Sequence, residues 1–449
     1  MNVRSAKLTS GPVGKTLINL AAPMLVGIIA MMAFNLIDTF YVAKLGTRKL
    51  AAMVLTFPVV MIIASFALGL GVGAVVTISR AIGESDHEKV RRLATDSLTL
   101  SVTLVAVLVT IGLFTIEPVF FSLGATPDNI HLVKQYMRIW YFGMVFVVVP
   151  MVGNNAIRAT GDTKTPSIIM LIAVAINGIL DPLLIFGIGP FPRLELAGAA
   201  LATVIARACT LTISLSILHF REQMLASPFA QLPVLITSWW RVLKTGLPVA
   251  ASNVLIPFTI AIVTRLVSGY GPEAVAGYGI ATRVEAFSLT LVFALSVSLG
   301  PFIGQNFGAR DFNRIEKGIK YSMRFSLLWG GVVFLILYFA GESIAVLFNT
   351  DNDVVSVATR YFMIVPASFA FFGMHQFSWA SLNALDNSLH SAGLEIIRSF
   401  VVLIPAALLG SKLWGIPGIF AAILTANTIA GIVSRAWLKR MLGKMREGE

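Results

Sequence analysis

The sequence predicts an all-α polytopic membrane protein, in which twelve transmembrane helices form two parallel six-helix repeats. Of the 449 residues, 57% are hydrophobic and only 12% are charged, about half the charged share of a soluble protein. The apolar residues form long runs, such as 101–116 and 327–340, and runs approaching ~20 residues are typical of membrane helices. The third observation is that the second half of the chain repeats the first.

Twelve segments are long and apolar enough to cross a bilayer. They cover residues 15–43, 50–80, 92–116, 132–157, 165–188, 197–219, 241–268, 274–304, 315–340, 354–383, 388–410 and 416–437. The first follows Arg4, Lys7 and Lys15 and is too long for the apolar region of a signal peptide, so we expect no cleavable signal. The single cysteine, Cys209, excludes an internal disulfide and offers no metal-ligand set.

The basic residues of the loops predict the orientation in the membrane. Lys and Arg gather in the loops 80–92, 158–164 and 310–324 and in the C-terminal tail. The segments 117–130, 269–273 and 341–353 contain neither. Because basic loops stay in the cytoplasm, we expect a protein of the cell inner (plasma) membrane with both termini cytoplasmic, although Lys44, Arg48 and Lys49 lie on the outer side. The net charge of +12 then reflects topology, and we expect no nucleic-acid partner.

The two halves align with each other at a constant offset of 225 residues. Pro23 falls on Pro248, and "AIGESDHEKV" aligns with "NFGARDFNRI" without a gap. Near the end the offset shortens to about 220, with Gly198 opposite Gly418. Chance rarely keeps one register through glycines and a proline. The repeat predicts an N-terminal lobe over 1–220, a cytoplasmic linker over 221–240 and a C-terminal lobe over 241–449, both lobes crossing the membrane in the same direction.

The repeat also separates residues that the fold needs from residues kept for another purpose. The predicted helices of the first half carry the polar residues Asp38, Asn177, Asp181 and Thr203. Their counterparts in the second half are Val263, Val402, Ala406 and Ile423, all of them apolar. Since the fold can be built without the polar set, the first half keeps it for chemistry.

The predicted depths bring this polar set together. Asp38, Asp181 and Thr203 each lie about six or seven residues from the outer end of their helix, roughly 9–11 Å at ~1.5 Å per residue. Asn177 lies one turn before Asp181 on the same face. Two carboxylates at one depth repel each other, and a shared proton or a bound cation relieves the repulsion. The set therefore predicts a coupling site for H+ or Na+. Buried Thr and Asn also join helices by hydrogen bonds, an alternative that stands above all for Thr203.

Other polar residues are weaker candidates. Arg283 and Glu285 in "ATRVEAF" lie near mid-membrane, where they could contact a substrate or form structural ion pairs with other helices. His375 in "GMHQF" is interpreted as a hydrogen-bonded packing residue. Pro23 leaves the carbonyl four residues before it without a backbone partner, so we expect a hinge in the first helix.

Five segments spread over 15–440 carry a family resemblance. They are "LIDTFYVAKLGTRKLAA", "GNNAIRATGD", "INGILDPLLIFG", "AGAALATVIA" and "IGQNFGARD". Together they resemble the multidrug and toxic compound extrusion (MATE) family, within the superfamily that also holds lipid-linked oligosaccharide flippases. The resemblance implies cation-coupled export of amphipathic, often cationic drugs by alternating access of two six-helix lobes.

The resemblance also implies roles for individual residues. Similar members carry an Asp in helix 1, an Asn and an Asp in helix 5 and a Thr in helix 6, which match the polar set already isolated. Members with a drug pocket in the first lobe suggest lining residues, and the expected substrate cavity comprises Met31, Phe34, Asn35, Asn154 and Arg283. Another branch places acidic residues in the second lobe, where helices 7 and 11 of this chain hold little beyond Glu395.

Two functions other than export fit the sequence less well. A flippase for a lipid-linked oligosaccharide or another lipid would need more helices and several cavity arginines, and Arg283 is the one mid-membrane candidate. A membrane-embedded enzyme would need a GxSxG or HExxH motif or a cluster of His and Cys, which the sequence lacks, so no enzyme is predicted. We expect a monomer whose partners are small amphipathic drugs and the lipid bilayer, with no cofactor and no metal beyond a coupling Na+.

Overall fold

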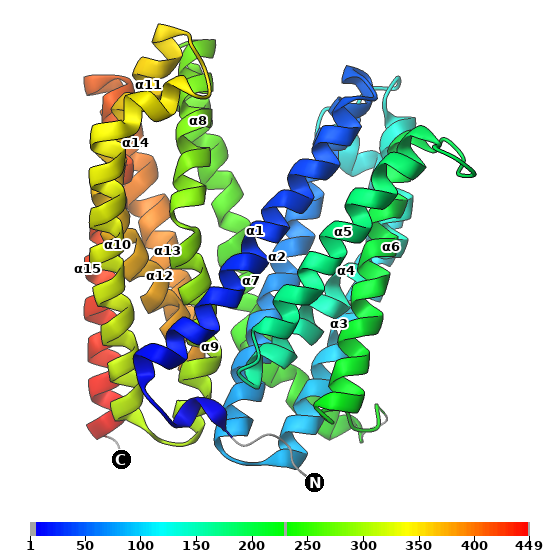
Figure 1. The fold of residues 1–449 in the computed structure, drawn as a ribbon, viewed down its shortest axis with the longest axis vertical. Helices are drawn as coiled ribbons and strands as arrows, with labels where there is room; N and C mark the ends of the chain where they lie inside the picture. The colour runs from blue at the N-terminus through cyan, green and yellow to red at the C-terminus, as the bar shows by residue number, and fades with distance from the viewer. Residues whose placement is uncertain (1–5, 229–230, 448–449) are drawn as a thin grey trace. The chain divides into compact units, whose positions relative to one another are not determined.

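Every regular element in residues 6–228 and 231–447, which this computed structural model describes, is a helix (Figure 1). The first half contains η1 (Lys7–Thr9), α1 (Val13–Ala43), α2 (Thr47–Gly83), α3 (His87–Ser122), α4 (Ile130–Ala159), α5 (Lys164–Phe186), α6 (Glu195–Ser216) and η2 (Ile217–Arg221). The second half contains α7 (Leu232–Ser268), α8 (Pro272–Ser288), α9 (Thr290–Gly308), α10 (Phe312–Val346), α11 (Asn352–Ile364), η3 (Val365–Ser368), α12 (Phe369–Ala384), α13 (Ser388–Ile396), η4 (Ile397–Leu403), α14 (Ile404–Trp414) and α15 (Ile416–Glu447).

The described residues contain 12 helical segments long and apolar enough to cross a membrane, which confirms the predicted fold class. The seventh begins at Leu232, inside the segment predicted as linker. Pro233 lies in its first turn, where a residue without a backbone N–H is tolerated. The predicted helix 274–304 is divided at Leu289 into α8 and α9, and the tenth span is interrupted by the 3-10 turn η3, which contains Pro366.

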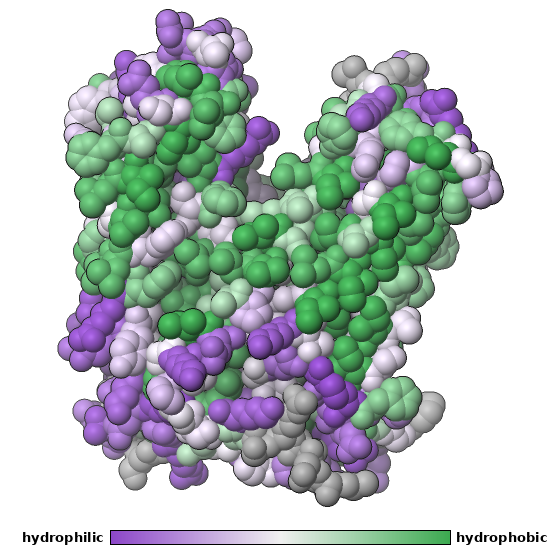
Figure 2. All heavy atoms as spheres, in the orientation of Figure 1, coloured by the Kyte–Doolittle hydropathy of each residue, from purple (hydrophilic) through white to green (hydrophobic). Residues whose placement is uncertain are grey.

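The chain folds into two compact units. The first consists of Met1–Leu8 with Ala22–Ala250, and the second of Thr9–Ala21 with Ala251–Glu449. The long helices α1 and α7 each contribute residues to both units. In each unit the hydrophobic residues cover the middle of the helices and hydrophilic residues gather toward the ends (Figure 2), as expected when the helix surface faces lipid.

Glycines let the helices of the first unit approach one another closely. A Cβ placed on Gly198 of α6 would lie 2.5 Å from the carbonyl oxygen of Leu184 in α5, and one placed on Gly143 of α4 would overlap Val204 of α6. Small residues are common where membrane helices pack. Because α6 is fixed against both α4 and α5, the polar residues on these helices hold defined positions.

The second unit uses the same device on its own helices. Gly410 of α14 and Gly418 of α15 face each other with no room for a Cβ on either residue, and Gly330 of α10 lies against Ala370 of α12. Gly418 is the residue that the repeat aligns with Gly198. Close packing at this point therefore belongs to the fold itself, because both halves need it.

An ion-pair cluster ties the end of the sixth span to the turn between α4 and α5. Arg221 donates to Asp162 Oδ2 at 2.6 Å and to Thr165 Oγ1 at 2.9 Å, and Thr165 donates to Asp162 through its backbone N–H and its hydroxyl. Burial alone would raise the pKa of Asp162, but the Thr165 hydrogen bonds and the Arg221 charge outweigh burial and hold this pKa below its usual value. The cluster therefore stays ionised at neutral pH.

Candidate functional site

The part of α1 that belongs to the first unit lies along α5 (Figure 1). Ser167 Oγ of α5 donates a hydrogen bond of 2.6 Å to the carbonyl oxygen of Pro23. Further along, Ile37 Cδ1 lies 4.0 Å from the position that a Cβ would take at Gly178. The helices run side by side at both levels, and the second contact places Asp38, the next residue of α1, beside the middle of α5.

Asp38, Asn177 and Asp181 form a buried polar cluster between α1 and α5. Their exposed fractions are 9%, 0% and 0%, and Asn177 Nδ2 donates to Asp181 Oδ1 at 3.1 Å. The two carboxylates lie close enough for the charge of one to act on the other. Tyr136 of α4 lies within range of both charges.

Several oxygen atoms of this cluster lack hydrogen-bond partners among the described residues. Asp38 Oδ1, Asp181 Oδ2 and Asn177 Oδ1 are buried, and among the described residues none of them has a hydrogen-bond partner. Buried polar groups are normally paired, and an unpaired buried carboxylate is costly. These oxygens are hard ligands of the kind that bind H+ or Na+. The described residues hold no group of three His, Cys, Asp or Glu arranged for a transition metal.

Thr203 lies at the level of Asp38. One turn deeper, the Arg207 guanidinium of α6 lies over the Phe34 ring of α1, 4.8 Å from its centroid. Because α1 and α6 run in opposite directions, stepping one turn outward from this contact leads to Asp38 on α1 and to Thr203 on α6. Thr203 is half-buried on α6, and its part in the cluster stays a prediction.

Arg207 is a residue that the sequence interpretation missed. Its Nε is buried without a hydrogen-bond partner, and within the described part of the chain no carboxylate pairs with it. An arginine inside a membrane helix is costly and marks a functional site by default. The sequence did contain a signal for it, because Arg207 lies twelve residues into the sixth span and one turn after Thr203. At the offset of 220, its counterpart is the neutral Asn427.

The other predicted cavity residues differ in their surroundings. Phe34 is buried beneath Arg207, and Asn154 of α4 is 7% exposed with an unpartnered Oδ1. Met31 and Asn35 are exposed on α1. Arg283 is exposed on α8, in the second unit. Within the first unit, Phe34 and Asn154 are thus buried whereas Met31 and Asn35 are exposed, and their common role in a substrate cavity stays a prediction.

The second unit has a polar network of its own, built on Glu395. His375 Nε2 lies 2.9 Å from Glu395 Oε2, and His375 Nδ1 lies 2.8 Å from Ser434 Oγ. Arg398 donates to Glu395 Oε1 at 2.6 Å, and Ser399 donates to the same oxygen at 3.0 Å. Both oxygens of Glu395 are thus occupied by protein donors, in contrast to those of Asp38 and Asp181. This network joins helices, as expected for His375.

A model of the family described as MatE matches residues 23–183 and 248–409. The two matched stretches begin at Pro23 and Pro248, the pair that the internal repeat aligns, so the model recognises each half of the chain once. The chain belongs to the MATE family. The resemblance inferred from the five sequence segments is confirmed, and the family is one of membrane transporters rather than enzymes.

Relatives cover nearly the whole chain. A protein of Shewanella oneidensis named FAD transporter is 37% identical over 95% of this chain and 94% of its own length. A probable multidrug resistance protein of Bacillus subtilis, YoeA, is 28% identical over 94% of each chain. The crystal structure of a mutant of the Vibrio cholerae MATE transporter VcmN has a TM-score of 0.91 at 27% identity, covering 96% of this chain and 97% of its own. The chain is therefore a multi-pass membrane transporter of small molecules.

Proposed function

We propose that this transporter exports amphipathic, often cationic compounds from the cytoplasm in exchange for H+ or Na+. The observation that carries the proposal is the pair of buried carboxylates in the first unit, whose oxygens Asp38 Oδ1 and Asp181 Oδ2 lack protein partners among the described residues. A proton or Na+ bound at the site would pair with these two oxygens. The name of the YoeA relative, a probable multidrug resistance protein, supports the export of drugs.

The coupling step begins at Asp38. Loading of a proton or Na+ removes net charge from the cluster and changes which groups α1 can bond. Pro23, fifteen residues earlier in α1, interrupts the backbone ladder, and its own carbonyl is held by Ser167 of α5. We propose that loading switches α1 between two shapes about Pro23, so that drug and cation compete for one lobe.

Transport into everted membrane vesicles tests this function. Ethidium should accumulate when the vesicle lumen is made acidic or rich in sodium, and the gradient that drives accumulation identifies the coupling ion. Accumulation should stop when both gradients are dissipated. Ethidium uptake that persists without either gradient and requires ATP would contradict cation coupling.

A second candidate substrate is a flavin dinucleotide. The observation that favours it is Arg207, which lies on the aromatic ring of Phe34 and has no counter-charge among the described residues. An arginine grips phosphate oxygens by paired hydrogen bonds, and the Shewanella oneidensis relative is named FAD transporter. A cationic drug would instead be repelled by this guanidinium.

We expect Arg207→Gln to abolish gradient-driven FAD transport and to leave ethidium transport unchanged or faster, because the change removes a positive charge from the cavity. Uptake of both compounds into everted vesicles measures this. Arg360→Gln, an exposed position of α11 in the second unit, is the matched control and should alter neither. If wild type carries ethidium but not FAD, the flavin candidate is wrong while cation-coupled drug export stands.

We also propose that both termini lie in the cytoplasm, on the basis of the basic loops. Alkaline phosphatase fused after Glu449, which lies outside the described residues, should be inactive, and a fluorescent protein fused there should fluoresce. Phosphatase fused in the Lys- and Arg-free segment 341–353 should be active. Active phosphatase at the C-terminus would show that the orientation is reversed.

A further inference from the structure

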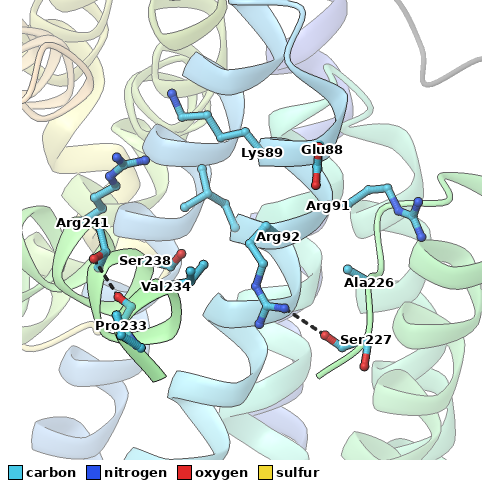
Figure 3. Close-up of a pocket in the computed structure, with 12 residues that line it drawn as sticks. Glu88, Lys89, Arg91, Arg92, Ala226, Ser227, Pro233, Val234, Ser238 and Arg241 are labelled. Atoms are coloured by element: carbon cyan, nitrogen blue, oxygen red, sulfur yellow. Dashed lines mark hydrogen bonds between the residues drawn. The ribbon is translucent and has the colours of Figure 1, made fainter. Parts of the chain in front are cut away.

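A basic pocket lies at the end of the first unit where α3 and α7 begin (Figure 3). It has a volume of about 690 Å³ and lies between the first two turns of α3, the first three turns of α7 and the connecting segment before α7. Its charged side chains are Glu88, Lys89, Arg91, Arg92 and Arg241. Since Glu84 pairs with Lys89 and Asp96 with Arg92, Arg91 and Arg241 against Glu88 leave a net positive charge that suits a phosphate-bearing ligand.

The wall of this pocket is fixed by hydrogen bonds between α3 and the connecting segment. Arg91 Nη2 donates to the carbonyl oxygen of Leu225 and Arg92 Nη1 to that of Ser227, both at 2.9 Å. The Ala226 N–H donates to Thr95 Oγ1 at 2.8 Å. Figure 3 shows the Arg92 side chain reaching toward Ser227. The pocket is therefore part of the folded unit rather than a gap beside a loose loop.

Arg241 is the basic side chain of the pocket that is available to bind a ligand. It is exposed on α7, and within the described ranges its side chain has no ion pair or hydrogen bond. Lys89 pairs with Glu84, at 2.5 Å, and Arg92 pairs with the buried Asp96. A ligand would thus meet one free guanidinium inside a positive pocket whose other cations are held in place.

The depth of the pocket favours a lipid over a soluble anion. It lies within the first three turns of two membrane spans, and Trp239 and Trp240 lie beside it on α7, as aromatic residues do at the membrane interface. Trp240 and Leu247, seven residues apart on one face of α7, are 63% and 46% exposed. Because Leu247 lies further into the span than Arg241, this apolar stripe leads from the pocket toward the middle of the span and offers a surface for acyl chains.

We propose that the pocket binds the phosphate headgroup of an anionic phospholipid, with the acyl chains along the stripe of Trp240 and Leu247. Basic pockets between membrane helices recognise lipid headgroups in this way. Arg241 supplies the free charge, and Arg91 and Arg92 add positive field while holding the wall. The assignment is independent of the coupling site and of the exported substrate.

Native mass spectrometry of the purified full-length protein tests the proposal. Cardiolipin, phosphatidylglycerol and phosphatidylcholine are offered separately, and bound lipid is counted. Wild type should retain the two anionic lipids and lose phosphatidylcholine. Arg241→Gln should weaken retention about fivefold, as expected for one basic residue near an anionic headgroup, and Glu88→Gln should strengthen it. Arg440→Gln, an equal charge change at an exposed position of α15, should have no effect.

Three results would overturn the assignment. Equal losses in Arg241→Gln and Arg440→Gln would show attraction by net charge alone. Equal retention of phosphatidylcholine would show that the pocket does not distinguish an anionic headgroup from a zwitterionic one. Displacement of bound cardiolipin by inorganic phosphate or pyrophosphate at matched concentration would show that the pocket is a site for a soluble anion. Because Arg241 has no partner in the described fold, misfolding would not account for the loss.

Discussion

Asp38→Asn should abolish gradient-driven export of ethidium while leaving expression and membrane insertion intact. The amide has nearly the shape of the carboxyl group but can neither release a proton nor carry the charge that attracts Na+. The variant therefore resembles the loaded state permanently, and it should insert and still bind drug. Ethidium efflux from energised cells should fall to the level of cells without the transporter.

The matched control is Asp353→Asn, an equal charge change at an exposed position in the first turn of α11. It should transport as wild type does. Ethidium efflux by Asp38→Asn at the wild-type rate, under a proton or a sodium gradient, would show that the proposed coupling mechanism is wrong.

The sequence could predict the helices and the buried carboxylates because both depend on local patterns. Hydropathy fixes the spans, since the bilayer demands about 20 apolar residues in each. The comparison of the halves isolated Asp38 and Asp181, because a fold built twice shows which polar residues it does not need. The structure places these two near each other, although their role in coupling stays a prediction.

The exposure of Asn35 and the surroundings of Arg207 could not be predicted in the same way. Asn35 is about 60° around the helix from Asp38, and only the packing of α1 on its neighbours decides that this angle leads out of the buried face. Arg207 meets Phe34 because α6 is fixed against α4 and α5 by glycine contacts. Such contacts join residues far apart in the chain, and the hydrophobic periodicity of the sequence does not predict them.

The network on Glu395 shows why a buried acid alone is a weak signal. In sequence Glu395 and Asp181 are equivalent, each an acid inside a predicted span. In the structure Glu395 accepts from Arg398 and Ser399 and lies beside His375, whereas within the described part of the chain Asp181 has one partner, Asn177. A carboxylate with free oxygens can exchange a cation, and one held by several donors stabilises its helices instead.

Asp181→Ala and Asn177→Ala should each abolish drug resistance with normal membrane insertion. Asp181→Ala removes the second carboxylate, so Asp38 alone would face an incoming cation. Asn177→Ala removes the only donor to Asp181 Oδ1 among the described residues, which makes the charged carboxylate costlier and disturbs its rotamer. The fold should tolerate both changes, because the second half of the chain carries Ala406 and Val402 at these positions.

Growth on ethidium measures resistance, and quantification of the protein in membranes measures insertion. Glu395→Ala provides the opposite pattern: it leaves Arg398 and His375 without their shared acceptor and should lower the amount of folded protein, because a buried cation that loses its partner is strongly destabilising, by about 3–5 kcal/mol. If Asp181→Ala lowered protein levels as Glu395→Ala does and the remaining protein transported at the wild-type rate per molecule, the Asp181 carboxylate would be a structural group and the coupling site would have to lie elsewhere.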